Sequence, residues 1–357
     1  MFCFEMRKQM SIGNNMKVKS IKVFGKGEVG LEETSFAVTA DETLVRVTRG
    51  GICGSDIHYY QHGGIGDFSL CHPMTLGHEV IGRIHQSGQT VAVNPSKACG
   101  KCFYCESGNS NQCVNMEFFG SAMRNPHVDG GFSEYLSVSK QQLVPYDDTI
   151  SDDVMAFSEP LSVAIHAINQ AGGVLGKRVL VTGCGPIGCL IIAACQAAGA
   201  SEIIGTDLSE RCRDIALEMG ADKVYSPLES LPTEYTADKG YFDVSFEASA
   251  AVQAFHGCID MTRAKGALVL VGMRPGMVDF PLTKCLAKEI NIRGTFRFVS
   301  EFETAVRWLE KGKVNPLPLL TRVFPFTQII DALKLAEDKT SAMKVQLSFE
   351  RQDEKFI

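Results

Sequence analysis

The hydrophobic pattern differs between the two halves of the chain. In the first half, short strand-like runs such as 43–47 and 89–93 are separated by clusters of Gly, Pro, Asn and Asp. These clusters favour turns, so the runs between them are predicted to be short strands. We therefore expect the first half to form a domain rich in strands and loops.

From about Arg178 onward, strand-like runs alternate with helical stretches. The expected strands are 178–182, 203–207, 242–246 and 267–271, and the expected helices are 186–198, 209–219 and 252–261. This alternation predicts a parallel sheet covered by helices on both faces. The second part of the chain is thus expected to be an α/β domain.

The chain after Gly294 has no new glycine-rich loop. It contains helical stretches near 301–311 and 327–337 and a strand-like run at 344–349. We expect this tail to return to the first domain, which divides the chain into residues 16–155, 156–294 and 295–357. Residues 1–15 lack an apolar run long enough for a signal peptide, and we expect a flexible extension that precedes a start at Met16.

Composition and charge indicate a globular protein that acts on small molecules. The 357 residues are 45% hydrophobic, which is enough to bury the cores of about two domains. The net charge of −6 and the lack of any Lys/Arg block disfavour nucleic acid and anionic membranes as partners. Without a signal peptide, the 13 cysteines are expected to be reduced thiols in the cytoplasm.

An uncharged stretch at 179–200 is long enough to suggest a membrane span. However, Gly183, Gly185, Pro186 and Gly188 interrupt it near its start. We expect a buried strand, a turn and a buried helix instead.

Four cysteines are spaced as C-x2-C-x2-C-x7-C, and they are Cys99, Cys102, Cys105 and Cys113. A short loop with this spacing can fold back and present four thiolates tetrahedrally, which is typical of a structural zinc site. An iron–sulfur cluster, scattered buried thiols and a zinc ribbon that contacts nucleic acid are the alternatives. The chain shows no sign of an electron-transfer partner, and its acidic balance argues against the ribbon.

A second, sparser set of metal-binding residue types precedes this loop. Cys53, Ser55 and His58 lie within 51–58, and His78 and Glu79 follow Gly77. Cys, His and Glu suit an open zinc site in which a vacant position accepts a hydroxyl oxygen. Each residue alone is more often a core, surface or ion-pair residue. Their occurrence together with the four-cysteine loop favours the metal site.

A strand at 179–182 leads into a G-x-G-x-x-G turn that opens a helix. The turn contains Gly183, Gly185, Pro186, Ile187 and Gly188. This context is typical of a dinucleotide site, where the pyrophosphate approaches the helix N-terminus. Asp207 follows Gly188 by nineteen residues and can accept hydrogen bonds from both ribose hydroxyls, which favours NAD. Arg211 and Arg213 follow closely and leave NADP possible.

The motifs G-x-C-G-S-D-x-H, G-H-E, the four-cysteine spacing and V-T-G-x-G-P-I-G occur in an order that resembles the zinc-containing medium-chain dehydrogenases. The resemblance runs over 18–349, and the stretches 50–60, 118–132, 157–165 and 296–298 resemble the polyol and aldonate branch. It implies a GroES-like β-rich catalytic domain plus a Rossmann domain with a doubly wound parallel sheet. It also implies a homodimer or homotetramer.

The activity implied is NAD(P)-dependent oxidation of a secondary hydroxyl on a small sugar acid. An uncharged polyol or an L-threonine-like substrate is the alternative within the family. A catalytically inactive protein that only binds the cofactor is the alternative outside enzymology.

The resemblance also implies residues for the catalytic zinc. It makes Cys53, His78 and Glu79 the ligands. It places Glu159 beside the metal, where it would hold water or act as an exchangeable ligand. The short link at 86–88 departs from the family, whose members usually have a longer loop there.

Further matching positions are implied to handle the proton and the substrate. Ser55 and His58 match the proton relay, in which Ser55 passes the proton by way of the cofactor ribose to His58 and solvent. Tyr59, Phe118 and Arg297 match positions that line the substrate pocket. Arg297 can bind a carboxylate through two hydrogen bonds, although a turn cap for Ser55, an ordinary exposed His58 and a structural ion pair for Arg297 are the simpler interpretations.

Overall fold

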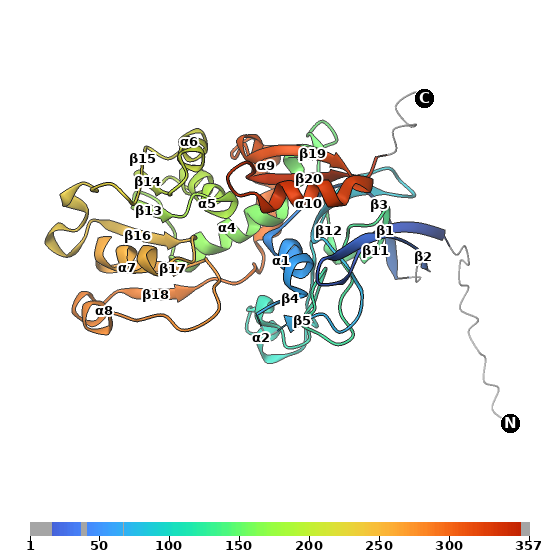
Figure 1. The fold of residues 1–357 in the computed structure, drawn as a ribbon, viewed down its shortest axis with the longest axis horizontal. Coiled ribbons are helices and arrows are strands. Elements are labelled where there is room, and N and C mark those ends of the chain that lie inside the picture. The colour runs from blue at the N-terminus through green and yellow to red at the C-terminus, as the bar shows by residue number, and fades with distance from the viewer. Residues whose placement is uncertain (1–15, 37–40, 67, 351–357) are drawn as a thin grey trace.

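The computed structural model describes residues 16–36, 41–66 and 68–350, so the expected extension at 1–15 lies outside the described residues. Two large sheets occupy opposite ends of an elongated molecule, with helix α4 (Ser158–Gln170) between them (Figure 1).

The first large sheet has the strand order β12-β8-β7-β3-β20-β19, and β11 pairs with β3. Its strands are β3 (Glu42–Gly51), β7 (Glu79–Ile84), β8 (Thr90–Val93), β11 (Tyr135–Ser139), β12 (Leu143–Pro145), β19 (Leu320–Pro325) and β20 (Lys344–Ser348). The predicted strands at 43–47 and 89–93 lie in β3 and β8. The short link at 86–88 is a tight turn between the antiparallel strands β7 and β8, closed by a hydrogen bond from Gly88 N to Ile84 O.

Smaller elements surround this sheet. They are β1 (Met16–Gly25), β2 (Glu28–Phe36), β4 (Gly64–Ile65), β5 (Phe68–Ser69), β6 (Met74–Thr75), β9 (Ser96–Lys97), β10 (Glu117–Phe118), α1 (Gly54–His62), α2 (Phe103–Glu106) and α3 (Asp152–Met155). The strands β1, β2 and β6 form a separate sheet, and β9 pairs with β10. A cysteine immediately precedes each of the helices α1 and α2, Cys53 and Cys102 respectively.

The second large sheet is parallel throughout, with the order β15-β14-β13-β16-β17-β18. Its elements are β13 (Arg178–Thr182), α5 (Pro186–Ala197), β14 (Glu202–Thr206), α6 (Glu210–Glu218), β15 (Lys223–Tyr225), β16 (Phe242–Glu247), α7 (Val252–Met261), β17 (Thr262–Leu270), α8 (Leu282–Lys288) and β18 (Asn291–Gly294). The chain moves outward from β13 in both directions, so the strand order reverses at β13 and β16. Ligands bind at such a reversal in doubly wound sheets.

The uncharged stretch at 179–200 forms β13, the glycine turn and α5, as predicted. Most of α5 is buried, including Leu190, Ile191 and Ile192. In the part of the chain that the structure describes, no helix is both long and apolar enough to cross a membrane.

Helix α4 was not predicted as an element. Ten of its 13 residues are buried, on nearly all of its sides, because it packs against both α5 and α9 (Glu301–Glu310). A helix buried all round lacks the polar face that gives a helical period in the sequence.

The C-terminal part forms α9, α10 (Ile329–Glu337), β19 and β20. Strand β20 lies antiparallel to β3, with Gln346 opposite Gly51, so the tail joins the first sheet. The exact boundaries of the three predicted parts stay a prediction.

Candidate metal and dinucleotide sites

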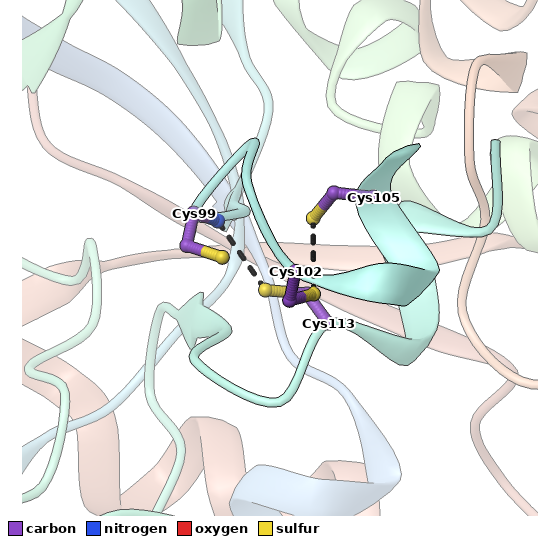
Figure 2. A group of neighbouring side chains, drawn as sticks. All are labelled: Cys99, Cys102, Cys105 and Cys113. Carbon is purple, nitrogen blue, oxygen red and sulfur yellow. Dashed lines mark hydrogen bonds between the residues drawn. The ribbon is translucent and has the colours of Figure 1, made fainter. Parts of the chain in front are cut away.

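The four cysteines of the C-x2-C-x2-C-x7-C motif converge in a loop that contains α2 and a short 3-10 turn at Ser110–Gln112. Their sulfurs all lie within 4.8 Å of one another and point toward a common centre (Figure 2). All four are free thiols, and Sγ of Cys102 lies 3.6 Å from Sγ of Cys105. Four converging sulfurs match the donor set of a structural zinc site.

Backbone amides favour the thiolate form in this loop. The amide of Cys99 donates to Sγ of Cys113 at 3.3 Å. Backbone N–H groups, chiefly that of Lys101, lower the pKa of Cys99 itself to about 6. A thiolate is the form of cysteine that binds metal, whereas burial and the neighbouring thiols raise the pKa of Cys105 to about 11, so a bound cation would displace the proton of Cys105.

Cys53, His78 and Glu79 form the second cluster, with ligand atoms that all lie within 4.8 Å of one another. Cys53 lies at the start of α1, and Glu79 begins β7. Asp56 holds the two segments together, since its carboxylate accepts from Cys53 N at 2.9 Å and from Gly77 N at 3.0 Å. Burial raises the pKa of this fully buried carboxyl group.

The Glu79 carboxylate forms a buried ion pair with Lys344. Nζ of Lys344 lies 2.5 Å from Oε1 and 2.5 Å from Oε2 of Glu79. Lys344 is on β20, and Gly51 on β3 leaves the space for the pair, because a Cβ at Gly51 would collide with the Glu79 carboxylate. The return of the C-terminal segment therefore completes the cluster.

The acidic groups around His78 favour the presence of a cation in this cluster. Burial opposes a charge on His78, yet Cys53, Glu159 and Asp56 raise its pKa to about 10. Nδ1 of His78 is buried without a hydrogen-bond partner among the described residues. One sulfur, one imidazole nitrogen and one carboxylate in an anionic pocket fit the open type of zinc site.

Glu159 lies in the first turn of α4, outside the cluster of three but electrostatically coupled to it. Burial, and to a lesser extent Glu79, raise the pKa of Glu159 to about 7, although His78 and Lys344 act in the opposite direction. This group can therefore change its protonation state near neutral pH.

Ser55 and His58 both lie on α1, at different distances from solvent. Oγ of Ser55 is buried and has no hydrogen-bond partner among the described residues. His58 is exposed, and its pKa is lowered by partial burial and then by His62 and Lys339. Ser55 can thus accept an inner proton, and His58 can exchange one with water.

Phe118 and Arg297 lie in contact beside the cluster. The ring of Phe118 is 5.5 Å from that of His78, and Cζ of Arg297 lies 3.9 Å above the centre of the Phe118 ring. Phe118 and Arg297 help to line a cavity of about 80 Å³. Tyr59 is buried close by, where its hydroxyl accepts a hydrogen bond from Ala122 N at 2.9 Å.

The Arg297 guanidinium lacks an oxygen partner. Burial lowers its pKa, to about 10, and its one hydrogen bond goes to Sδ of Met123 at 3.1 Å. Among residues 16–36, 41–66 and 68–350, no carboxylate or carbonyl oxygen accepts from it. A guanidinium held by ring faces and a weak sulfur acceptor can bind an oxyanion through its free N–H groups. No close ion pair therefore holds Arg297 within these residues, although the nearby Glu159 charge favours the charged form of the guanidinium.

In the glycine turn after β13, two glycines allow close contacts within the protein and one faces open space. Gly183 has φ +85°, and a Cβ there would lie 2.6 Å from Ser249 N. A Cβ at Gly188 would strike the carbonyl of Gly183, whereas one at Gly185 would meet no atom within 4 Å. Pro186 and Ile187 begin α5, so the open side of the turn faces a helix N-terminus.

Asp207 and the two arginines that follow it separate in space. The Asp207 carboxylate accepts from Cys184 N and Ser209 N, both at 2.8 Å, which fixes it beside the glycine turn. Arg213 donates to the carbonyls of Asp207 and Leu208, at 2.7 and 2.9 Å. Arg211 donates to the carbonyl of Ser341 in the C-terminal segment. Neither guanidinium bonds to the Asp207 carboxylate.

Two residues of this region were missed from the sequence. Asp56 is part of the quoted motif G-x-C-G-S-D-x-H, but no role was assigned to it. Lys344 begins a strand in which Gln346 and Ser348 are also polar, so its charge gives no local signal of the buried ion pair.

Comparisons with known proteins find two family models that match the chain. Residues 39–148 match the family model described as an alcohol dehydrogenase GroES-like domain, and residues 186–311 match that of a zinc-binding dehydrogenase. These matches confirm the predicted fold class, a GroES-like domain with a Rossmann-type parallel sheet.

Individual relatives cover nearly the whole chain. It is 52% identical over 341 residues to L-idonate 5-dehydrogenase (NAD(P)(+)) of Escherichia coli, a match that covers 94% of this chain and 99% of the relative. The crystal structure of L-idonate 5-dehydrogenase from E. coli superposes with a TM-score of 0.92 at 51% identity, covering 93% and 98% of the two chains. Sorbitol dehydrogenase of Gallus gallus is 32% identical, with coverages of 88% and 91%.

Proposed function

This chain belongs to the zinc-containing, NAD(P)-linked medium-chain dehydrogenase family, and from that premise we propose that it oxidises L-idonate to 5-keto-D-gluconate. The observation that carries the proposal is the Cys53, His78 and Glu79 cluster beside an arginine without an oxygen partner. The 52% identity to L-idonate 5-dehydrogenase of E. coli supports the substrate.

The described residues include candidates for binding the catalytic zinc and for transferring the substrate proton. Cys53, His78 and Glu79 would hold zinc, which supplies, when bound, a Lewis acid that makes the substrate hydroxyl easier to deprotonate. Ser55 would relay the proton: its buried Oγ accepts the proton of that hydroxyl as its own hydroxyl proton passes on toward the cofactor ribose and His58. His58 exchanges protons with solvent, and its lowered pKa keeps it neutral and able to accept a proton at neutral pH.

The dinucleotide and the second metal have separate sites. The turn of Gly183, Gly185 and Gly188 and the Asp207 carboxylate would hold NAD(P), which supplies the hydride acceptor. The four-cysteine loop would hold a structural zinc, distinct from the reaction.

Reduction of a small panel of keto sugars and keto sugar acids, with NADH and with NADPH, tests this function. We expect the largest kcat/KM for 5-keto-D-gluconate and a smaller one for fructose, the ketose related to sorbitol. A preference for the uncharged ketose would favour a polyol dehydrogenase. A lack of any substrate-dependent change in NADH absorbance would favour an inactive cofactor-binding protein.

Arg297→Met is expected to lower kcat/KM for L-idonate by roughly 10- to 100-fold, because it removes a charge-assisted hydrogen-bonding group from the substrate carboxylate. The loss for sorbitol should be much smaller. Steady-state kinetics on both substrates measure the difference. Arg322→Met is the matched control, since Arg322 also stacks on a ring, that of Phe324, but is exposed and lies elsewhere. Equal losses on both substrates would remove the carboxylate role.

Asp207→Ala is expected to lower kcat/KM for NAD about tenfold and to raise kcat/KM for NADP. The ratio of the two values, which measures the preference for NAD, should therefore fall. The reason is that Asp207 would bind the ribose hydroxyls and repel a 2′-phosphate. The test is kcat/KM for both cofactors on one substrate. Asp214→Ala, on the exposed side of α6, serves as control. A clear NADP preference of the unmodified protein would show instead that Arg211 and Arg213 outweigh Asp207.

We further propose a homodimer or homotetramer that assembles through the open edge of the parallel sheet. The edge strand β18 follows a segment with exposed apolar side chains, among them Met277 (100% exposed), Leu282 and Leu286. Such a patch beside an unpaired edge favours association. Leu286→Glu should yield a smaller particle in light scattering coupled to gel filtration. An unchanged mass would place the interface elsewhere.

The remaining proposals concern organisation and location. We propose the division into residues 16–155, 156–294 and 295–357, supported by the pairing of β20 with β3. All twelve cysteines in the described residues are free thiols, which supports a reducing compartment, the cytoplasm.

A further inference from the structure

The segment at 295–300 joins β18 to α9 and carries Arg297; we call it the Arg297 loop. Arg297 has φ +54°, in the left-handed region that residues with a Cβ rarely occupy. Contacts from other parts of the molecule must therefore stabilise this loop conformation. Two such contacts come from opposite sides of the loop.

The first contact comes from the four-cysteine loop. Nδ2 of Asn111, a buried residue, donates a hydrogen bond to the carbonyl of Phe296 at 2.9 Å. Asn111 lies in the 3-10 turn between Cys105 and Cys113. A candidate metal-binding loop is thus bonded directly to the residue before Arg297.

The second contact comes from Glu301, the first residue of α9. Its Oε2 accepts from the backbone amides of Val299 and Ser300, at 2.7 and 3.0 Å. Its Oε1 accepts from Nδ1 of His166 at 3.0 Å and from Nδ2 of Asn169 at 2.8 Å, both on α4. The buried Glu301 carboxylate therefore ties the end of the Arg297 loop to the central helix.

Glu301 keeps its charge in the folded protein. Burial opposes this charge, but the hydrogen bonds from His166, Asn169 and Val299 lower the pKa of Glu301 to about 2. Because a charged acceptor forms stronger hydrogen bonds than a neutral one, this charge strengthens the contact near neutral pH.

We propose that Asn111 and Glu301 are positioning residues that hold the Arg297 guanidinium over Phe118 and thereby determine the preference for a sugar acid over a polyol. This inference rests on the proposed function, in which Arg297 binds the substrate carboxylate. Neither Asn111 nor Glu301 lines the cavity that Arg297 and Phe118 share. Their influence on specificity acts through Arg297. In this proposal the four-cysteine loop has two roles. It stabilises its own part of the fold, and through Asn111 it fixes the position of Arg297 in the substrate pocket.

The test compares kcat/KM for L-idonate and sorbitol in Asn111→Ala and Glu301→Ala. Loss of one buried hydrogen-bonding group should lower the idonate-to-sorbitol ratio about threefold to tenfold, mainly through KM for idonate. Glu301→Gln keeps an acceptor oxygen and should retain most of the ratio. Asn109→Ala and Glu303→Gln are matched controls on the exposed surface of the same two elements and should leave it unchanged. Zinc content and Tm of each variant identify any general damage.

A double-mutant cycle with Arg297→Met separates positioning from general damage. In the Arg297→Met background, Asn111→Ala and Glu301→Ala should cause no further fall in the ratio, whereas fully additive losses would overturn the proposal. If Arg297→Met weakens both substrates equally, the carboxylate role fails, and the same cycle read on either substrate still decides the positioning role. If Arg297→Met changes kcat/KM for neither substrate, both the carboxylate role of Arg297 and the positioning role of Asn111 and Glu301 fail. Should Glu301→Ala not fold, the cycle of Asn111→Ala with Arg297→Met decides the outcome.

Discussion

Replacement of His78 by alanine is expected to abolish turnover and to leave a folded chain. His78 supplies the only imidazole of the Cys53, His78 and Glu79 cluster. Its loss leaves two ligands, too few for an open zinc site, which in known enzymes uses three protein ligands. Because a metal Lewis acid contributes several kcal/mol to transition-state stabilisation, kcat should fall about a thousandfold or more.

Three measurements on His78→Ala make this outcome specific. NADH formation should be lost, metal analysis should find one zinc per chain in place of two, and circular dichroism should match that of the unmodified protein. His256→Ala is a suitable control, since this histidine bonds to the carbonyl of Asp279 far from the cluster. Turnover within tenfold of the unmodified enzyme would contradict the assignment of His78 as a metal ligand.

Replacement of Cys102 by serine is expected to act on stability first. A closed set of four thiolates binds zinc with free energy that contributes to folding, so removal of one ligand should destabilise the four-cysteine loop by several kcal/mol. Tm should fall, and proteases should cut within residues 99–113 before the rest of the chain unfolds. Specific activity per correctly folded molecule should fall less than in His78→Ala.

Cys71→Ser is the matched control, because Cys71 is an exposed free thiol outside both clusters. If Cys102→Ser and Cys71→Ser have the same Tm and the same zinc content, the four-cysteine loop is not a structural metal site. A further expectation concerns substrate preference. If Asn111 positions Arg297, Cys102→Ser should also weaken discrimination in favour of L-idonate, since Asn111 lies in the loop that this zinc would order.

Local sequence patterns predicted both metal clusters and the dinucleotide turn, because the residues of each lie within one or two short motifs. They did not predict the contacts that complete these sites. Lys344 is 265 positions away from Glu79, and Glu301 is 135 away from His166. Such pairs form only when the C-terminal segment returns to the first sheet and α9 packs on α4, and a single sequence contains no local sign of that.

Arg211 shows a different limit of sequence reasoning. Its position four residues after Asp207 places it close to the cofactor ribose along the chain, but its guanidinium bonds to Ser341 in the C-terminal segment. The position of a residue on a helix determines the direction of its Cα–Cβ bond. The end of a long, flexible side chain can still turn toward a hydrogen-bond acceptor in another segment. Its role in cofactor binding stays a prediction that the NADP measurement addresses.

The most direct test of the central claim measures zinc content and L-idonate-dependent NADH formation on the same undialysed sample. We expect two zinc ions per chain together with turnover, loss of turnover when a chelator removes the zinc of the Cys53, His78 and Glu79 cluster, and recovery when one equivalent is restored. Full turnover in a sample that contains no zinc would contradict the account.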